Sequence, residues 1–147
     1  MNSCSGPCPD SVRAWTNLLR AEHAVRSAVE AQLKQAGYPP LSWYAVLMEL
    51  DAAPEGRLRP FELEQRIAFK QYNLSRLVAR LSEEGLVQTA QCPNDARGHH
   101  VQITAAGRAL KSAMWPAYAQ AIDKHFSGKL AAGEAEQLAQ LLERVLR

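Results

Sequence analysis

Long hydrophobic runs are missing from this chain of 147 residues. No apolar segment approaches the ~18 residues that a membrane-spanning helix needs. Residues 1–7 have neither the basic cluster nor the apolar stretch of a secretory signal, and three cysteines are too few for a disulfide framework. We therefore expect a cytoplasmic protein in a reducing compartment, with no membrane among its partners.

An excess of charge of one sign is also missing, because the formal net charge is only +2. The distribution of the charges is more informative than their sum. Residues 57–111 contain nine Lys or Arg and five Asp or Glu, a local balance of +4, whereas the rest of the chain has eight against ten. This asymmetry is typical of a basic functional module attached to a near-neutral scaffold.

The side chains that carry catalysis do not occur in recognisable combinations. The sequence has no nucleophile–base pair, no glycine-rich loop for phosphate and no pair of carboxylates at a credible spacing. Its histidines lack the spacing of metal ligands. We therefore predict that the protein is not an enzyme and holds no metal or other cofactor.

The segment 66–81 has four Lys or Arg and no Asp or Glu. Within it, Leu74, Leu77, Val78 and Leu81 recur at helical spacing, which predicts one buried stripe on a helix over roughly 71–84. Arg76 and Arg80 lie one turn apart on the other side, and Gly85 is suited to end the helix in the left-handed conformation. One apolar face and one cationic face are typical of a helix that meets a polyanion.

Two short apolar runs, 86–91 and 100–104, flank a polar tip at 93–98 and predict a β-hairpin. A basic helix followed by a hairpin with Arg97 at its tip points to a winged helix that binds DNA. We expect Arg76 and Arg80 to contact phosphates or guanine edges. Near the start of the helix, Gln71, Asn73 and Ser75 are suited to reading base edges. We expect Arg97 to enter a narrow minor groove.

The remaining helical patterns complete a mainly α fold with a small β-hairpin wing. We expect a tail over 1–9, helical dimerisation regions over 10–40 and 105–147, and a winged helix-turn-helix module over 41–104. Within the module, Ser42 is expected to cap a helix and Pro60 to start another over roughly 60–68. Thr104 is expected to cap a helix that extends to about 126, and a last helix covers about 132–146. Amphipathic helices at both chain ends predict a homodimer, because a central module leaves them little else to cover.

In this order of elements the chain resembles the MarR family (multiple-antibiotic-resistance regulators). The most specific match is Asp95-x-Arg97-x-x-x-Val101-x-Ile103-Thr104-x-x-Gly107-Arg108, which is similar to the family's wing signature. Residues 84–87 and 73–78 resemble the exit from the recognition helix and the helix itself. The resemblance covers roughly residues 10–146. The chain departs from the pattern in three places. Ala96 stands where a second basic residue is common, Ala131 stands where a Ser or Thr cap is usual, and Phe61-Glu-Leu-Glu replaces a more usual Glu-Leu-Ala start of the third helix.

The resemblance implies a transcriptional regulator, a repressor in its most common form. It would bind a pseudo-palindromic operator as a homodimer and leave the DNA when a small effector binds. It implies that Asp95 orients a neighbouring arginine and has a structural role in the wing. It also implies an effector pocket between the dimer helices and the DNA module, where aromatic walls suit a small aromatic ligand. Its candidate lining residues are Trp15, Tyr44, Trp115 and Tyr118.

Two other interpretations stay open from the sequence alone. In the first, the protein is a regulator that senses oxidants through Cys4, Cys8 or Cys92. Relatives that do so carry the cysteine inside the first helix, and Cys4 and Cys8 precede it. In the second, the chain is a helical-dimer interaction module without DNA binding, which requires the basic helix to be merely solvated.

Overall fold

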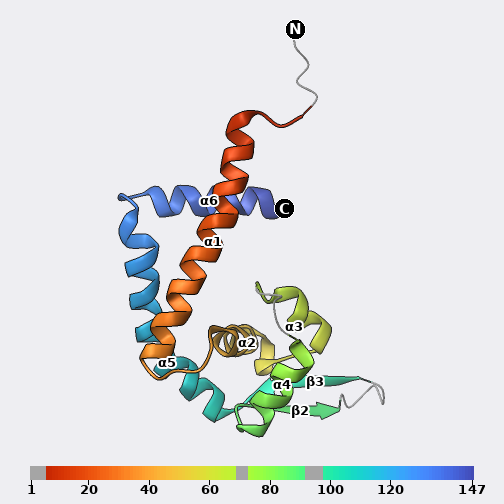
Figure 1. Cartoon of the computed structure of the whole chain (residues 1–147). Helices are drawn as coiled ribbons and strands as arrows, with labels where there is room; N and C mark the ends of the chain where they lie inside the picture. Colours follow the sequence, from red (N-terminus) through yellow and green to blue (C-terminus); the bar gives the residue numbers. More distant parts are fainter. Residues whose placement is uncertain (1–5, 69–72, 92–97) are drawn as a thin grey trace. The chain divides into compact units, whose positions relative to one another are not determined.

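The computed structural model describes residues 6–68, 73–91 and 98–147. Six α-helices, a small antiparallel sheet and two short 3-10 turns make up this part of the chain (Figure 1). The helices are α1 (Pro9–Gln35), α2 (Leu41–Ala52), α3 (Pro60–Arg66), α4 (Leu74–Glu83), α5 (Ala105–His125) and α6 (Glu134–Leu146). The strands are β1 (Arg57–Leu58), β2 (Val87–Gln91) and β3 (His99–Ile103), and the turns are η1 (Pro54–Gly56) and η2 (Ser127–Lys129). The predicted fold class, mainly α with a small wing, is confirmed.

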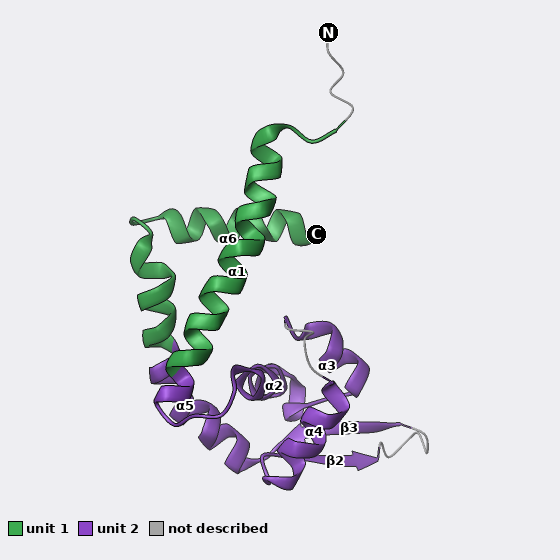
Figure 2. Ribbon diagram, viewed as in Figure 1, with its two compact units in different colours: residues 1–32, 119–147 green, residues 33–118 purple. Residues whose placement is uncertain are grey.

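The described chain divides into two compact units, coloured separately in Figure 2. Unit 1 comprises residues 1–32 and 119–147, and unit 2 comprises residues 33–118. Both boundaries fall inside helices, because α1 and α5 each contribute one end to each unit. The predicted boundary at 40/41 lies instead at the start of α2, and the one at 104/105 lies at the start of α5.

Unit 2 has a hydrophobic core built from its helices and one face of its sheet. The sheet has the strand order β1-β3-β2, with both pairs antiparallel, and Thr89 lies opposite Val101. Val87, Val101 and Ile103 are buried in this core, and the Gln102 side chain between the last two is only partly buried. The fully buried Leu47, Leu50, Leu63 and Leu81 come from α2, α3 and α4.

Several local signals in unit 2 act as the sequence predicts. Pro60 starts α3, and Gly85 follows α4 in the left-handed region at φ 72°. The Thr104 hydroxyl donates to the Gly85 carbonyl oxygen (2.7 Å) and accepts the Gly107 N–H (3.1 Å), which caps α5. A Cβ on Gly107 would collide with the Leu86 carbonyl oxygen, so glycine lets the start of α5 approach the end of α4.

Other local predictions are wrong in their details. Ser42 does not cap α2, because that helix begins at Leu41 after Pro40 and has no side-chain cap bond. The helix α4 begins at Leu74 and not at 71. The last helix begins at Glu134 after Gly133, two residues later than predicted, and Ala131 lies outside it.

Unit 1 has few buried apolar residues of its own. A polar contact joins α1 to α5 within this unit, where the His125 Nε2 and the Gln32 Oε1 are 3.0 Å apart. Most of its large apolar side chains are exposed: Val12, Trp15, Leu18, Leu19, Phe126, Leu141, Val145 and Leu146. Among the described residues, no helix is long and apolar enough to cross a membrane.

Candidate nucleic-acid interface

The helix α4 presents two different faces, because its apolar residues follow the helical repeat. Leu77 and Leu81 are buried in the core of unit 2, and Leu74 and Val78 pack partly buried against it. The opposite side is exposed and consists of Ser75, Arg76, Ala79, Arg80, Ser82 and Glu83. The predicted division of this helix into a core face and a polar face is therefore confirmed.

The start of α4 is fixed by Asn73. The Asn73 backbone is extended, and its Oδ1 accepts the backbone N–H of Arg76 at 3.2 Å. This is the N-cap arrangement, which satisfies an N–H that the helix itself cannot pair. That Asn73 reads a base edge stays a prediction, and in the structure its side-chain oxygen holds the start of the helix that carries Arg76.

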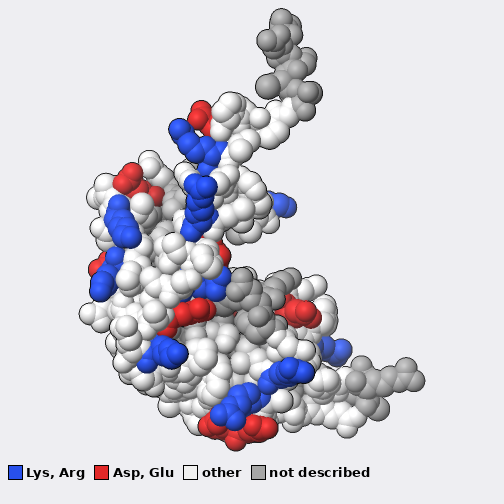
Figure 3. Space-filling model, viewed as in Figure 1, with Lys and Arg blue, Asp and Glu red and all other residues white. Residues whose placement is uncertain are grey.

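The two arginines of α4 differ in their surroundings. The Arg80 guanidinium lies 3.6 Å from a Glu83 carboxylate oxygen and 3.3 Å from one of Glu84. Arg76 is exposed and has no ion pair within the described chain. Figure 3 shows acidic side chains directly beside the basic ones over this helix. Between Leu74 and Glu84 the formal charges cancel, two against two.

A groove of about 910 Å³ separates α3 and the side of α4 from the strands of the wing. Its walls are apolar at Leu74, Val78 and Val101, and polar at Ser75, Ser82, Thr89 and His99. Glu64 and Glu83 give it two carboxylates, and Phe61 lines it with 60% of its surface exposed. Sequence reasoning missed Phe61 and Glu83, because their shared position depends on how α3 and α4 pack.

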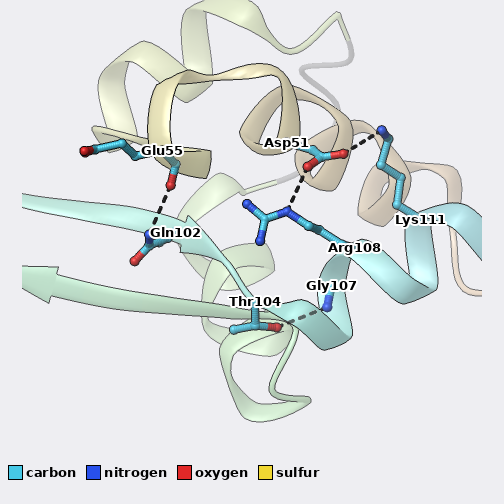
Figure 4. Close-up of polar contacts among 7 residues, drawn as sticks. All are labelled: Asp51, Glu55, Gln102, Thr104, Gly107, Arg108 and Lys111. Atoms are coloured by element: carbon cyan, nitrogen blue, oxygen red, sulfur yellow. Dashed lines mark hydrogen bonds and ion pairs between the residues drawn. The ribbon is translucent and has the colours of Figure 1, made fainter.

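Figure 4 shows polar contacts that join β3 to the turn η1 and the helix α2 to α5. The Gln102 Nε2 donates to the Glu55 carbonyl oxygen at 3.0 Å, and Gln88 and Gln102 pair across the strands. The Asp51 carboxylate accepts from Arg108 Nε at 3.0 Å and from Lys111 Nζ at 2.9 Å. These two bonds, the Lys111 bond being the stronger influence, lower the pKa of Asp51 below its usual range. Asp51 thus joins the end of α2 to the first turns of α5.

Three of the four predicted pocket residues come together in unit 2. The ring centroids of Tyr44 and Tyr118 are 4.8 Å apart, and those of Trp115 and Tyr118 are 5.9 Å apart. Tyr44 is only 5% exposed, whereas Trp115 is 51% exposed. Burial raises the pKa of both tyrosines. The fourth residue, Trp15, is an exposed residue of unit 1.

Several predicted residues lie outside the described chain. They are Gln71, Asp95 and Arg97, together with Cys4 and Cys92. Cys8 is described and exposed, and a hydrogen bond with the Ser11 hydroxyl lowers the pKa of its thiol. Among the described residues, no group of His, Cys, Asp and Glu is arranged to hold a metal ion.

A model of the MarR family matches residues 36–98. That range includes α2, α3, α4, β1 and β2 and ends just before β3. Residues 36–98, which are less than half of the chain, thus match the MarR family. This family consists of transcriptional regulators and not of enzymes, which agrees with the absence of catalytic combinations in the sequence.

One curated relative is the transcriptional regulator HosA of Escherichia coli O111:H-, which is 32% identical over 73 residues. That match covers 50% of this chain and 53% of HosA, so it spans about half the length of the relative. The similarity to HosA supports the family for the matched part of the chain. It does not extend to the activity of the whole protein.

Two solved structures illustrate the MarR fold over nearly the full chain. Sco3205 from Streptomyces coelicolor, crystallised in complex with DNA, has a TM-score of 0.83 at 23% identity and covers 99% of this chain and 91% of its own. BpsR from Bordetella bronchiseptica has a TM-score of 0.78 at 22% identity and covers 92% of this chain and 99% of its own. Its structure concerns the regulation of DNA binding by 6-hydroxynicotinic acid. At these identities the likeness concerns the fold.

Proposed function

We propose that this MarR-family protein regulates transcription by binding double-stranded DNA as a homodimer, with α4 in the major groove. The observation that carries the proposal is the arrangement of α4 in unit 2. A buried apolar stripe fixes the helix on a core, and its opposite face, with Arg76 in the first turn, is exposed. Recognition helices of this class place their N-terminal residues against base edges.

The hairpin beside α4 supports the same function. β2 and β3 pair in register from Val87 with Ile103 to Gln91 with His99, and residues 92–98 of the sequence form the segment between them. That segment contains Arg97, and an arginine at a wing tip is suited to a narrow minor groove. We propose that the wing contacts the groove next to the one that α4 occupies, with Asp95 in a structural role.

The homodimer is proposed from the surface of unit 1. Leu141, Val145 and Leu146 of α6 are 55%, 75% and 84% exposed, and Trp15 of α1 is 59% exposed. Apolar surface of this kind is stabilised when a second copy covers it. Two copies related by a twofold axis would read a pseudo-palindrome with half-sites about one helical turn apart.

We further propose repression that a small aromatic effector relieves. The cluster of Tyr44, Trp115 and Tyr118 offers flat apolar walls, and Trp115 keeps half its surface accessible. The Bordetella relative, whose DNA binding 6-hydroxynicotinic acid regulates, supports an aromatic acid as the class to test. A 100-fold loss of DNA affinity requires the effector to favour the other conformation by about 2.7 kcal/mol.

DNA retained from a random duplex library tests the central proposal, with a shuffled duplex of equal composition as reference. Arg76→Ala should cost about 1–3 kcal/mol and relax one base preference if Arg76 reads a base. If Arg76 holds a phosphate, affinity should fall equally on both duplexes and the salt slope should drop by about one. Unchanged affinity for both duplexes would exclude Arg76 from the interface. Selection of no sequence would favour the interaction module without DNA binding.

Intrinsic tryptophan fluorescence tests the effector, since Trp15, Trp43 and Trp115 are the three tryptophans of the chain. Aromatic acids that shift this fluorescence should also release DNA, and Trp115→Leu should weaken both effects. If no acid of the panel shifted the fluorescence or released DNA, the proposal of an aromatic effector would be wrong. Peroxide treatment with Cys8→Ser as control would then decide whether a thiol controls DNA binding.

A further inference from the structure

The charges of α4 are arranged against the preferences of an isolated helix. Arg76 occupies the third position of the helix, where the positive end of the helix dipole favours anions. Glu83 is the last residue of the helix and Glu84 caps it, where the dipole favours cations. The Arg80–Glu84 pair also has its cation on the N-terminal side, the weaker orientation for this spacing.

Helix stability therefore does not explain where these charges lie. Departures from local preference tend to mark functional positions. Arg76 faces solvent without an ion pair within the described chain, as a DNA contact requires. Glu83 and Glu84 need a different explanation, because carboxylates beside a recognition helix repel phosphates.

The contacts of Arg80 supply that explanation. Both carboxylates lie within 4 Å of its guanidinium, and all three side chains are exposed, with 46–70% of their surface accessible. Glu83 also lines the groove between α4 and the wing, where Glu64 adds a second negative charge. Two carboxylates hold one cation, so this end of the helix presents a net negative charge to an approaching phosphate backbone.

We infer that Glu83 and Glu84 are specificity-determining residues that withhold Arg80 from non-specific DNA. This inference rests on the proposed DNA-binding function. Non-specific binding depends almost entirely on phosphate contacts, so a cation that is already paired lowers it directly. Base contacts from the first turn of α4 supply the sequence specificity of the complex, and these contacts do not need Arg80. The glutamates thus raise the ratio of specific to non-specific affinity.

The test compares wild type, E83Q/E84Q, R80A and the combination of all three on two duplexes. One duplex is retained from a random library and the other is its shuffled sequence. E83Q/E84Q should bind the shuffled duplex about three- to tenfold more tightly, with a salt slope steeper by about one, because one phosphate contact is gained. On the retained duplex the gain should stay below about twofold. Adding R80A should abolish the gain, whereas R80A alone should change non-specific affinity little.

Glu64→Gln is the matched control, because it removes one negative charge from the same groove without releasing an arginine within the described chain. It should leave the non-specific affinity within about twofold of wild type. Thermal unfolding of E83Q/E84Q should match or slightly exceed wild type, since two anions leave the C-terminal end of a helix.

Equal gains on both duplexes, or a gain that persists in the R80A background, would overturn the inference while leaving DNA binding intact. An equal gain in Glu64→Gln would do the same, because charge alone would then explain the result. Absence of DNA binding by every variant would overturn the inference and the proposed function together.

Discussion

The two units of the chain keep their apolar side chains in opposite places. Of the eleven large hydrophobic side chains that are exposed among the described residues, eight belong to unit 1, although unit 1 is the smaller of the two. Of the buried apolar residues, only Val29 and Ala121 belong to the described part of unit 1, whereas unit 2 has the core cluster. Unit 2 is therefore stabilised by its own packing, and unit 1 offers surface that a second copy is proposed to cover.

The largest expected effect is on the core of unit 2. Leu81 is fully buried, so Leu81→Ala should destabilise the protein by about 2–5 kcal/mol through lost burial and a cavity. Urea unfolding at a fixed protein concentration measures this change. Leu141→Ala is the matched control, because Leu141 is 55% exposed within one chain. If Leu81→Ala and Leu141→Ala lowered the free energy of unfolding by similar amounts at high dilution, the two units would not differ in packing as described.

The next effect should appear on unit 1. Leu141→Asp with Val145→Asp places two charges on the exposed apolar face of α6 and should raise the dimer dissociation constant at least 100-fold, or about 2.7 kcal/mol. Light scattering should report twice 16.3 kDa for wild type and 16.3 kDa for the variant. Gln140→Asp, on the polar side of α6, should leave the dimer intact. A wild type that scatters as a monomer would contradict the proposed covering of unit 1.

A smaller effect tests whether Asn73 acts as the cap of α4 or reads DNA. Asn73→Ala removes the cap of α4 and should cost about 1 kcal/mol, whereas Asn73→Asp retains an acceptor and should cost little. Thermal unfolding measures both. Ser75→Ala, two residues further along and exposed, should leave stability unchanged. If Asn73→Ala weakens DNA binding without any loss of stability, the side chain reads DNA directly and the cap is incidental.

The smallest effect concerns pH. Since the pKa of Asp51 is lowered in the folded state, its pairs with Lys111 and Arg108 stabilise the fold above the ordinary carboxyl pKa. That contribution is lost as pH falls through the lowered folded-state pKa. Asp51→Asn should therefore lose less stability than wild type between about pH 5 and pH 3, by less than ~1 kcal/mol because the pair is partly exposed. Parallel acid-unfolding curves for both proteins would show that Asp51 contributes nothing.

Signals that act over a few residues made much of the fold predictable from sequence. The stripe of α4, the left-handed Gly85, the start of α3 at Pro60 and the Thr104 cap each depend on neighbours in the chain. The sequence was less reliable for α2. That helix is buried on several sides, at Leu41, Tyr44, Ala45, Val46, Leu47 and Leu50, so it lacks a single apolar face, and the predicted cap at Ser42 missed its start at Leu41.

The sequence by itself determined the elements, their order and the resemblance to the MarR family, because helical periodicity, turn residues and the wing signature are local properties. Only the tertiary structure decided how particular side chains are used. Asp51 meets Arg108 and Lys111 across 57 and 60 residues of chain, and Glu83 joins Phe61 and His99 around one groove. From the sequence, Arg80 is expected to be an unpaired cation. In the structure its guanidinium forms ion pairs with two glutamates. Which charge remains available to DNA depends on distances between side chains, and these are set only when the chain is folded.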